Sequence, residues 1–403
     1  MSKYVLYGDG INDDTLAIQE MLDSGVSEVF LPAPKKHYSI SKTLKIHSNQ
    51  TFRLGETTLI KLLPNSSCRM ITNAEKDAHD ISIIGGIWDY DNVNQAPNII
   101  KTEKAEWFRS ITHNNCKPDT VVNYDILGEM GVAISFAHVT RFRACNLTIK
   151  NPVTFSFQIA YVTHFTIENI YFDQNFGNPT AENMDGIHVD GGCHYGSIRN
   201  VQGTCYDDIV ALNADDCYDG PITNISIDGV YGTNSLRGVR LLSINSLVEN
   251  ISISNVFGTF YQNCVGLTYF YPKNGVRGKM SHISIRNIYG KNAHRRPEYQ
   301  KGDDSFFRFA FVWVDGDIDI DQVTIDNLYR NEEISHVETI KVCKGAKIKN
   351  LSLSNILHQR TTDTPTTLFL NEGEIDKLYM YNVDPSNDKL LENNGVIGKI
   401  IEY

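Results

Sequence analysis

Three stretches share one pattern, a short strand followed by a turn: TNISIDGVYG (223–232), ENISISNVFG (249–258) and SHISIRNIYG (281–290). In each of them Ile or Val alternates with a polar residue over four or five positions, which is the period of a β-strand. They lack the apolar spacing of three and four residues that a helical repeat needs. The copies therefore predict short strands whose alternate side chains point into a core.

Further copies extend this repeat from residue 79 to residue 385. Aligned on one turn residue, the copies follow at steps from 18 residues (Asn151 to Asn169) to 40 residues (Asn287 to Asn327). A β-propeller needs four strands in each repeat of about 40 residues, and most of these steps are too short for that. Steps of variable length predict a solenoid of stacked coils whose loops leave at fixed corners. The aligned turn residues are Asn151, Asn169, Asn200, Gly229, Asn255, Asn287, Asn327, Asn355 and Asn382.

The first residues differ from the repeat. The stretch from residue 13 to residue 23 has apolar residues on one helical side, Asn12 or Asp13 as its N-cap and Gly25 as its stop. The open end of a solenoid exposes apolar interior and unpaired strand edges. We expect a short α-helix that caps this end, with an N-terminal cap of about residues 1–25.

Charge and composition exclude several classes of protein. The 403 residues include 37 Lys and Arg against 48 Asp and Glu, a formal net charge of -11, which disfavours nucleic acid and anionic lipid as partners. No apolar stretch is long enough to span a membrane. The eight cysteines form no CxxC pair, so we interpret them as free buried thiols. No export signal is visible, so we expect a cytoplasmic or virion-associated protein, or one secreted by a route that this chain does not encode.

The beginning of the chain resembles a known superfamily. GDGINDDTLAIQ (8–19), a strand that ends at Leu31-Pro32, YSI (38–40) and IHSN (46–49) are similar in order and spacing to the start of many pectin lyase-like proteins. The resemblance implies an all-β fold, a single-domain right-handed parallel β-helix over about residues 25–403. That superfamily contains hydrolases, lyases, epimerases and phage tail spikes, so the fold alone does not determine the function.

Two acidic blocks, Asn183–Val189 and Tyr206–Leu212, lie one coil apart in this scheme. Aligning their inward-pointing Ile, Val and Leu residues requires a shift of 23 residues, which sets Asp208 over Asp185. Stacked coils lie about 4.8 Å apart, and two carboxylates that close raise one pKa and can hold a water molecule between them. Asp207 points elsewhere and is expected farther away, which allows the separation of about 6.5 to 9.5 Å between acid and base in an inverting glycosidase.

The same blocks are similar to those of the polygalacturonases, glycoside hydrolase family 28, which have an Asn-Thr-Asp-Gly block and a Gly-Asp-Asp block roughly one coil later. The resemblance implies that Asp207 protonates the leaving oxygen, while Asp185 and Asp208 hold the water that attacks with inversion. We therefore expect catalytic roles for Asp185, Asp207 and Asp208.

The chain departs from that family in the next two coils. Arg237 stands where the family has the His of Gly-His-Gly, since the register places it 29 residues after Asp208. One coil further, Gly266 and Thr268 replace both cations of the Arg-Ile-Lys motif that grips galacturonate. Plain polygalacturonate is thus not the expected substrate. We expect the substrate to contact Asn183, His188, Arg237, Arg240 and Lys273.

Two segments interrupt the coil period, at about residues 87–133 and 291–304, and we expect both to wall a groove around the carboxylates. The aromatic residues of the first segment, Trp88, Trp107, Phe108 and Tyr124, either stack on sugar rings or form a small core of their own. The second segment carries Arg295, Arg296 and Lys301.

No metal site or other cofactor is expected. His188 and His194 share a coil, but two such His residues do not by themselves predict a zinc site. We assign Asp215 and Asp216 to a turn, where Ca²⁺ is an alternative together with Asp219.

The sequence leaves three functions open. The first is a glycoside hydrolase, inverting, that cleaves a polysaccharide or oligosaccharide in a groove on the β-helix with the three Asp residues. The second is a lyase, which would abstract an acidic proton from a uronic acid with Arg or Lys as base, and Arg237 beside Asp208 keeps it open. The third is a non-catalytic glycan-binding protein such as a tail-spike body. The expected partner is a carbohydrate in each case. The sequence leaves the oligomeric state open between a monomer and, if the protein is tail-spike-like, a trimer.

Overall fold

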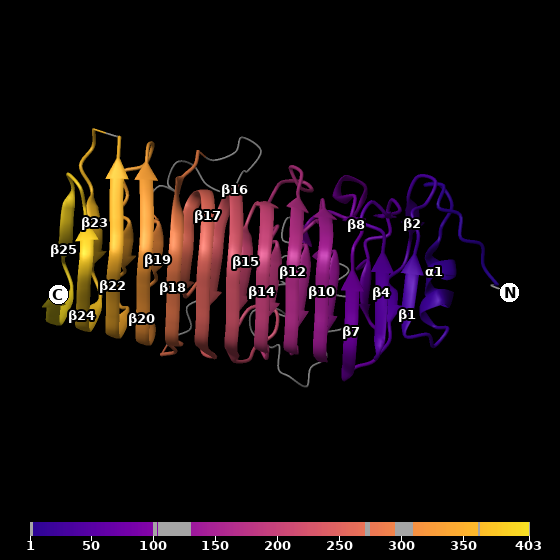
Figure 1. Cartoon of the computed structure of the whole chain (residues 1–403), viewed down its shortest axis with the longest axis horizontal. Coiled ribbons are helices and arrows are strands. Elements are labelled where there is room, and N and C mark those ends of the chain that lie inside the picture. The colour runs from indigo at the N-terminus through magenta and orange to yellow at the C-terminus, as the bar shows by residue number, and fades with distance from the viewer. Residues whose placement is uncertain are drawn as a thin grey trace.

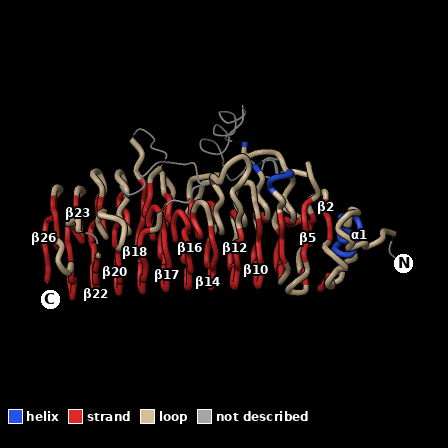
Figure 2. The backbone as a smooth tube through the Cα atoms, turned by 90° about the horizontal axis from the view of Figure 1, so that it is seen from above, coloured by secondary structure: helices blue, strands red, loops and turns tan. Residues whose placement is uncertain are grey.

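The computed structural model describes residues 3–99, 103, 130–270, 275–294, 309–361 and 363–402. These residues form a right-handed parallel β-helix, as the sequence predicted. The coils follow one another along the long axis from the N-terminus to the C-terminus, and the α-helix Thr15–Leu22 lies at the N-terminal end (Figure 1; Figure 2).

The described elements are, in chain order, α1 (Thr15–Leu22), β1 (Glu28–Leu31), β2 (Tyr38–Ile40), β3 (Leu44–Ile46), β4 (Gln50–Leu54), β5 (Leu59–Leu62), β6 (Ile71–Asn73), β7 (Ala78–Ile84), β8 (Ile87–Asp89), the 3-10 helix η1 (Asn92–Asn94), β9 (Ile134–Ala137), β10 (Val139–Lys150), β11 (Phe157–Ala160), β12 (Thr163–Asp173), β13 (Ile187–Asp190) and β14 (His194–Thr204). They continue with β15 (Asp208–Asn213), β16 (Ile222–Leu242), β17 (Leu247–Thr268), β18 (Gly278–Asn292), β19 (Val312–Val314), β20 (Ile318–Glu332), β21 (Ile340–Val342), β22 (Lys347–Arg360), β23 (Thr367–Asn371), β24 (Glu374–Asp384), β25 (Lys389–Asn393) and β26 (Val396–Glu402).

Strands of neighbouring coils pair in parallel, so that like residues stack. Ile251 lies over Ile225 and is followed by Ile283, and all three side chains are buried. The polar residues between them face outward, which explains the alternation in the sequence. One apolar core therefore runs through the stack of coils.

Asparagine residues occupy the corner at which the long strands bend. Asn287 has a left-handed backbone, donates from Nδ2 to Asn255 Oδ1 (3.1 Å) and accepts from Asn327 Nδ2 (2.9 Å). Asn tolerates this backbone conformation better than most residues, and its amide is both donor and acceptor. Asn255, Asn287 and Asn327 thus form a ladder of hydrogen bonds along one corner of the solenoid.

One residue of the predicted alignment is wrong. Leu147 pairs with Ile170, so the partner of Asn169 in the preceding coil is Asn146, and the two amides share a hydrogen bond. Asn151 has a left-handed backbone too, but it lies at another corner and donates to Asp89. Two Asn residues five positions apart made this copy ambiguous in the sequence.

The N-terminal helix and the interrupting segments differ from expectation in detail. The helix begins at Thr15, and its N-cap is Asp14 rather than Asn12 or Asp13. The coil continues through β8, which pairs with β5 and β10, so the first interruption begins after Asp89. Trp88 belongs to the core and lines no groove. The other aromatic residues predicted there, Trp107, Phe108 and Tyr124, and the basic residues Arg295, Arg296 and Lys301 of the second segment lie outside the described residues.

None of the helices in the described ranges is long and apolar enough to cross a membrane. Seven cysteines are described, and each is a free thiol.

The asparagine ladder leads to a test with two substitutions. We expect Asn287→Ala to lower the free energy of unfolding by about 1–2 kcal/mol for the left-handed backbone, with about 1 kcal/mol more for the lost hydrogen bonds. Asn287→Gly removes the same amide but suits the backbone, so it should be the milder change. Chemical denaturation of both variants measures this, and equal losses in the two would contradict a role for the backbone conformation.

Candidate active site

Asp185, Asp207 and Asp208 lie together between two neighbouring coils, and all three are buried. Asp185 precedes β13, and Asp208 begins β15. The two strands pair with the predicted shift, Ile187 against Val210. One oxygen of each carboxylate lies within 4.8 Å of the other two. We expected Asp207 to lie farther away, and this expectation is wrong. The chain bends just before β15, so the carboxylates of Asp207 and Asp208 both reach Asp185.

The backbone of the two coils holds Asp185 against Asp208. The N–H of Asp208 donates to Asp185 Oδ1 (3.0 Å), and the N–H of Gly186 donates to the carbonyl oxygen of Asp208 (2.8 Å). A β-carbon at position 186 would lie 2.5 Å from the carbonyl oxygen of Ile209. Only glycine allows the strands to approach this closely, so Gly186 is part of what positions the carboxylates.

Two arginines bind the paired carboxylates from the next coil. Asp208 pairs with Arg237 in the register between β15 and β16, as predicted. Arg237 Nη1 donates to Asp207 Oδ1 and to Asp208 Oδ1, both at 2.9 Å, and Arg240 Nε lies 2.8 Å from Asp208 Oδ2. The ring of Phe270 lies 5.2 Å and 5.4 Å from the two guanidinium groups. Both cations are thus engaged by the carboxylates of the chain itself.

His188 lies beneath this site and connects two carboxylates. Its Nδ1 is 2.6 Å from Asp185 Oδ2, its Nε2 is 3.2 Å from Asp190 Oδ1, and Phe155 stacks on the ring at 3.8 Å. Burial lowers the pKa of His188, but the charge of Asp190 and the hydrogen bonds with both carboxylates raise it more, to about 10. Both ring nitrogens already face carboxylates of the chain, so neither is left for the predicted contact with substrate, and we expect His188 to position Asp185.

Asp185 has an environment unlike that of an ordinary carboxyl group. Burial raises the pKa of Asp185 from 3.8 to about 6, against the hydrogen bond with His188, and the charges of Asp207 and Asp208 add to the rise. A carboxyl group of this kind carries a proton at mildly acidic pH. Groups perturbed in this way are typical of sites that transfer protons.

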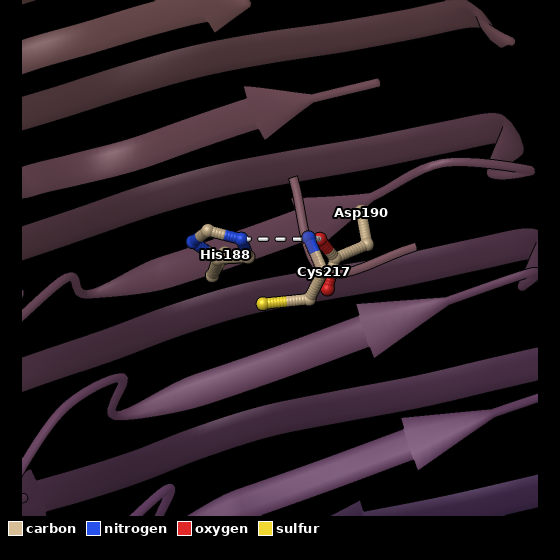
Figure 3. A group of neighbouring side chains, drawn as sticks. All are labelled: His188, Asp190 and Cys217. Carbon is tan, nitrogen blue, oxygen red and sulfur yellow. Dashed lines mark hydrogen bonds and ion pairs between the residues drawn. The ribbon is translucent and has the colours of Figure 1, made fainter. Parts of the chain in front are cut away.

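Two groups of side chains in the described ranges could hold a metal ion: the three carboxylates, and His188 with Asp190 and Cys217. Figure 3 shows that His188 and Asp190 meet with Cys217 beside them. A metal ligand must offer a lone pair, whereas His188 directs a nitrogen at a carboxylate on each side and its raised pKa favours a proton on both. The carboxylates in turn accept from Arg237. The side chains of both groups are therefore better suited to binding protons and arginine than to binding a metal ion.

The other predicted residues are distributed as follows. Asn183 has a left-handed backbone beside the site, and its buried Oδ1 has no hydrogen-bond partner. Lys273 lies outside the described residues. Asp215 is a turn residue, as expected, since its Oδ2 accepts the N–H groups of Ile244, Asn245 and Ser246 at 2.8 Å.

Sequence reasoning missed two members of the site. Asp216 was assigned to the turn, but its Oδ2 lies 3.9 Å from His188 Nε2 and 4.0 Å from Arg240 Nη2. Asp190 was not singled out. Its position two residues after His188 on one strand was the available signal, because both side chains must then face the same side.

The buried imidazolium leads to a test in the pH dependence of stability. The pKa of His188 is raised from 6.5 to about 10 on folding, so its protonated form stabilises the protein fully below pH 6.5 and this contribution is lost as the pH rises toward 10. We expect the stability advantage of the wild type over His188→Gln to shrink across that range. Denaturant unfolding of both proteins at several pH values measures it. An advantage that stays constant would show that His188 is neutral in the folded protein.

No protein-family model matches the chain, and no curated protein matches it. Solved structures do. A family 28 exopolygalacturonase of Yersinia enterocolitica is similar with a TM-score of 0.56 and 13% identity over 93% of this chain and 77% of the other. An endo-xylogalacturonan hydrolase from Aspergillus tubingensis gives 0.57 and 14% over 97% and 98%. A double mutant of the tailspike protein of E. coli bacteriophage HK620 gives 0.55 and 12% over 96% and 75%.

At sequence identities this low, the activity of a similar structure cannot be assigned to this chain, because one fold hosts many functions. What the three structures share with this chain is the fold, a right-handed parallel β-helix.

Proposed function

We propose that this protein is a glycoside hydrolase that cleaves a polysaccharide or oligosaccharide at Asp185, Asp207 and Asp208. The observation that carries the proposal is the meeting of three carboxylates within 4.8 Å of one another, with the pKa of one of them, Asp185, raised to about 6. A glycosidase needs a carboxyl group that gives a proton to the leaving oxygen and a carboxylate that takes one from the attacking water. A base is most effective when its pKa lies near the working pH, and the raised pKa of Asp185 suits that role.

The exposure of the three side chains supports an assignment of the acid and of the carboxylates that hold the water. Asp207 is the most exposed, at 9%, against 2% for Asp185 and none for Asp208. In the proposed reaction Asp207 delivers the proton to the leaving oxygen as the glycosidic bond breaks. Asp185 and Asp208 hold the water, whose oxygen bonds to the sugar carbon while its proton passes to a carboxylate.

Inversion of the anomeric centre is proposed from the resemblance to polygalacturonases alone. The nearest carboxylate oxygens lie within 4.8 Å, whereas acid and base in inverting enzymes are about 6.5 to 9.5 Å apart as a rule. A gap of this size still admits one water molecule with hydrogen bonds of about 2.8 Å on either side.

A lyase is less well supported. Its base would have to be Arg237, but that guanidinium already donates to Asp207 and Asp208 and has no lone pair to accept a proton. A non-catalytic glycan-binding protein is the second candidate. The observation that favours it is the position of Asp208, which is fully buried between two arginines.

A panel of polysaccharides, assayed for new reducing ends and for ultraviolet absorbance, tests the proposal. We expect reducing ends without an absorbing, unsaturated product. In Asp207→Asn and Asp208→Asn, turnover should fall by at least about 10², the usual cost of losing a positioned acid or base. The matched control is Asp173→Asn, an exposed carboxylate on β12 that pairs with Lys150. Near-full activity of Asp207→Asn would refute the site, and an absorbing product would identify a lyase.

The proton that Asp185 holds predicts the pH dependence of activity. Since the pKa of Asp185 is raised to about 6, this group becomes a carboxylate that can take a proton from water only as the pH rises through that value. We expect kcat/KM of the wild type to rise as the pH rises through 6. The measurement is a pH profile on the substrate found in the panel. A kcat/KM that falls as the pH rises through 6 would mean that Asp185 supplies the proton as the acid instead.

A further inference from the structure

One row of outward-facing residues crosses the site from coil to coil. The register places Ala211, Arg240, Gly266, Trp313 and Lys341 at successive positions of this row. Gly266 alone among them has no side chain, and it lies one coil beyond the arginines that bind the carboxylates. The residue that fills the position above it comes from the same strand, β17.

The side chain of Asn263 fills the position above Gly266. A β-carbon at position 266 would lie 3.3 Å from Asn263 Oδ1 and 3.5 Å from its Nδ2, so the amide lies over the outward face of Gly266. Asn263 is fully buried, yet neither amide atom has a hydrogen-bond partner. The neighbouring Gln262 is 4% exposed, and its Oε1 also lacks one. We name Asn263 and Gly266 the Asn263 site.

Buried amide groups without hydrogen-bond partners are rare in proteins. They cost free energy, because their hydrogen bonds to water are lost on folding and are not replaced. Such groups at the edge of a candidate active site indicate a polar ligand that completes them. The pair on Asn263 combines a donor with an acceptor. A sugar hydroxyl is likewise both donor and acceptor, and a pair of hydroxyls on one ring can satisfy both amide atoms.

The charges around the Asn263 site disfavour an anionic sugar. The cluster beside it contains five carboxylates, Asp185, Asp190, Asp207, Asp208 and Asp216, against three cations, His188, Arg237 and Arg240. Each of these cations is already paired with carboxylates of the cluster. The carboxylate of a uronic acid would therefore add negative charge to a region with negative charge in excess.

We propose that the Asn263 site binds a neutral, hydroxylated sugar unit of the substrate, and that Asn263 selects it over a uronic acid. The inference rests on the proposed function for the position of the bond that is cleaved, but not for binding itself. Trp313, next along the row and partly exposed, offers an aromatic surface to the adjoining part of the glycan.

Binding to the full chain carrying Asp207→Asn tests this without turnover. The probes are neutral oligosaccharides of xylose, galactose and rhamnose and, at equal length, oligogalacturonates, each titrated by calorimetry. We expect at least one neutral series to bind about tenfold more tightly than the oligogalacturonates, which is the difference made by about 1.4 kcal/mol. Adding Asn263→Ala should weaken that binding about tenfold, and the isosteric Asn263→Asp should do the same. Asn245→Ala, which removes an exposed amide, is the matched control.

The thermal midpoint of Asn263→Ala without ligand separates a binding effect from misfolding. Because the amide makes no hydrogen bond in the free protein, we expect the midpoint to stay within a few degrees of that of the parent. Tighter binding of oligogalacturonates, failure of every neutral probe to bind, or unchanged affinity in Asn263→Ala would overturn the inference.

The two proposals fail differently. If neutral probes bind but the wild type releases no reducing ends from any polysaccharide, the hydrolase proposal falls and the binding site stands. If reducing ends come only from polygalacturonate, the hydrolase proposal stands and the inference about the Asn263 site falls.

Discussion

The hydrogen bonds between parallel strands of neighbouring coils are the constraint on which this structure depends. They decide which residue of one coil lies over which residue of the next, and they bring coils to about 4.8 Å from one another. The same register stacks Ile251 on Ile225 in the core and Arg237 on Asp208 in the candidate site. Core and candidate site are therefore two faces of one set of strand pairings, and a slip of one residue would destroy both.

The candidate site concentrates charge in a buried position, where proteins usually avoid it. Buried carboxylates are costly unless they are paired, and here Arg237 and Arg240 pair with Asp208 while His188 joins Asp185 to Asp190. The pairing is uneven, because Asp185 keeps a raised pKa and Asn263 keeps an amide without partners. Incomplete satisfaction of this kind is expected where a substrate supplies the missing contacts.

The rigid surroundings explain how such a site persists. Asparagine amides bond to one another along a corner of the solenoid, and long strands pair on both sides of each coil. A scaffold repeated in this way holds side chains in place without relying on loops. The site residues described above lie on strands or within a few residues of a strand end, as at Asp185 and Phe270.

The sequence by itself determined the repeat, the solenoid and the partners of each coil. Inward-pointing residues must be apolar in every coil, so the alignment of Ile187 with Val210 could be found without coordinates, and with it the meeting of Asp185 and Asp208. The alignment of the copies was ambiguous where one copy contained two possible turn residues, as at Asn146 and Asn151. Only the tertiary structure decided that Asp207 also reaches the cluster, that Asp216 joins it and that His188 is buried beneath it. These depend on how the chain turns between strands and on the direction of single side chains, and a period of two residues contains no information about either.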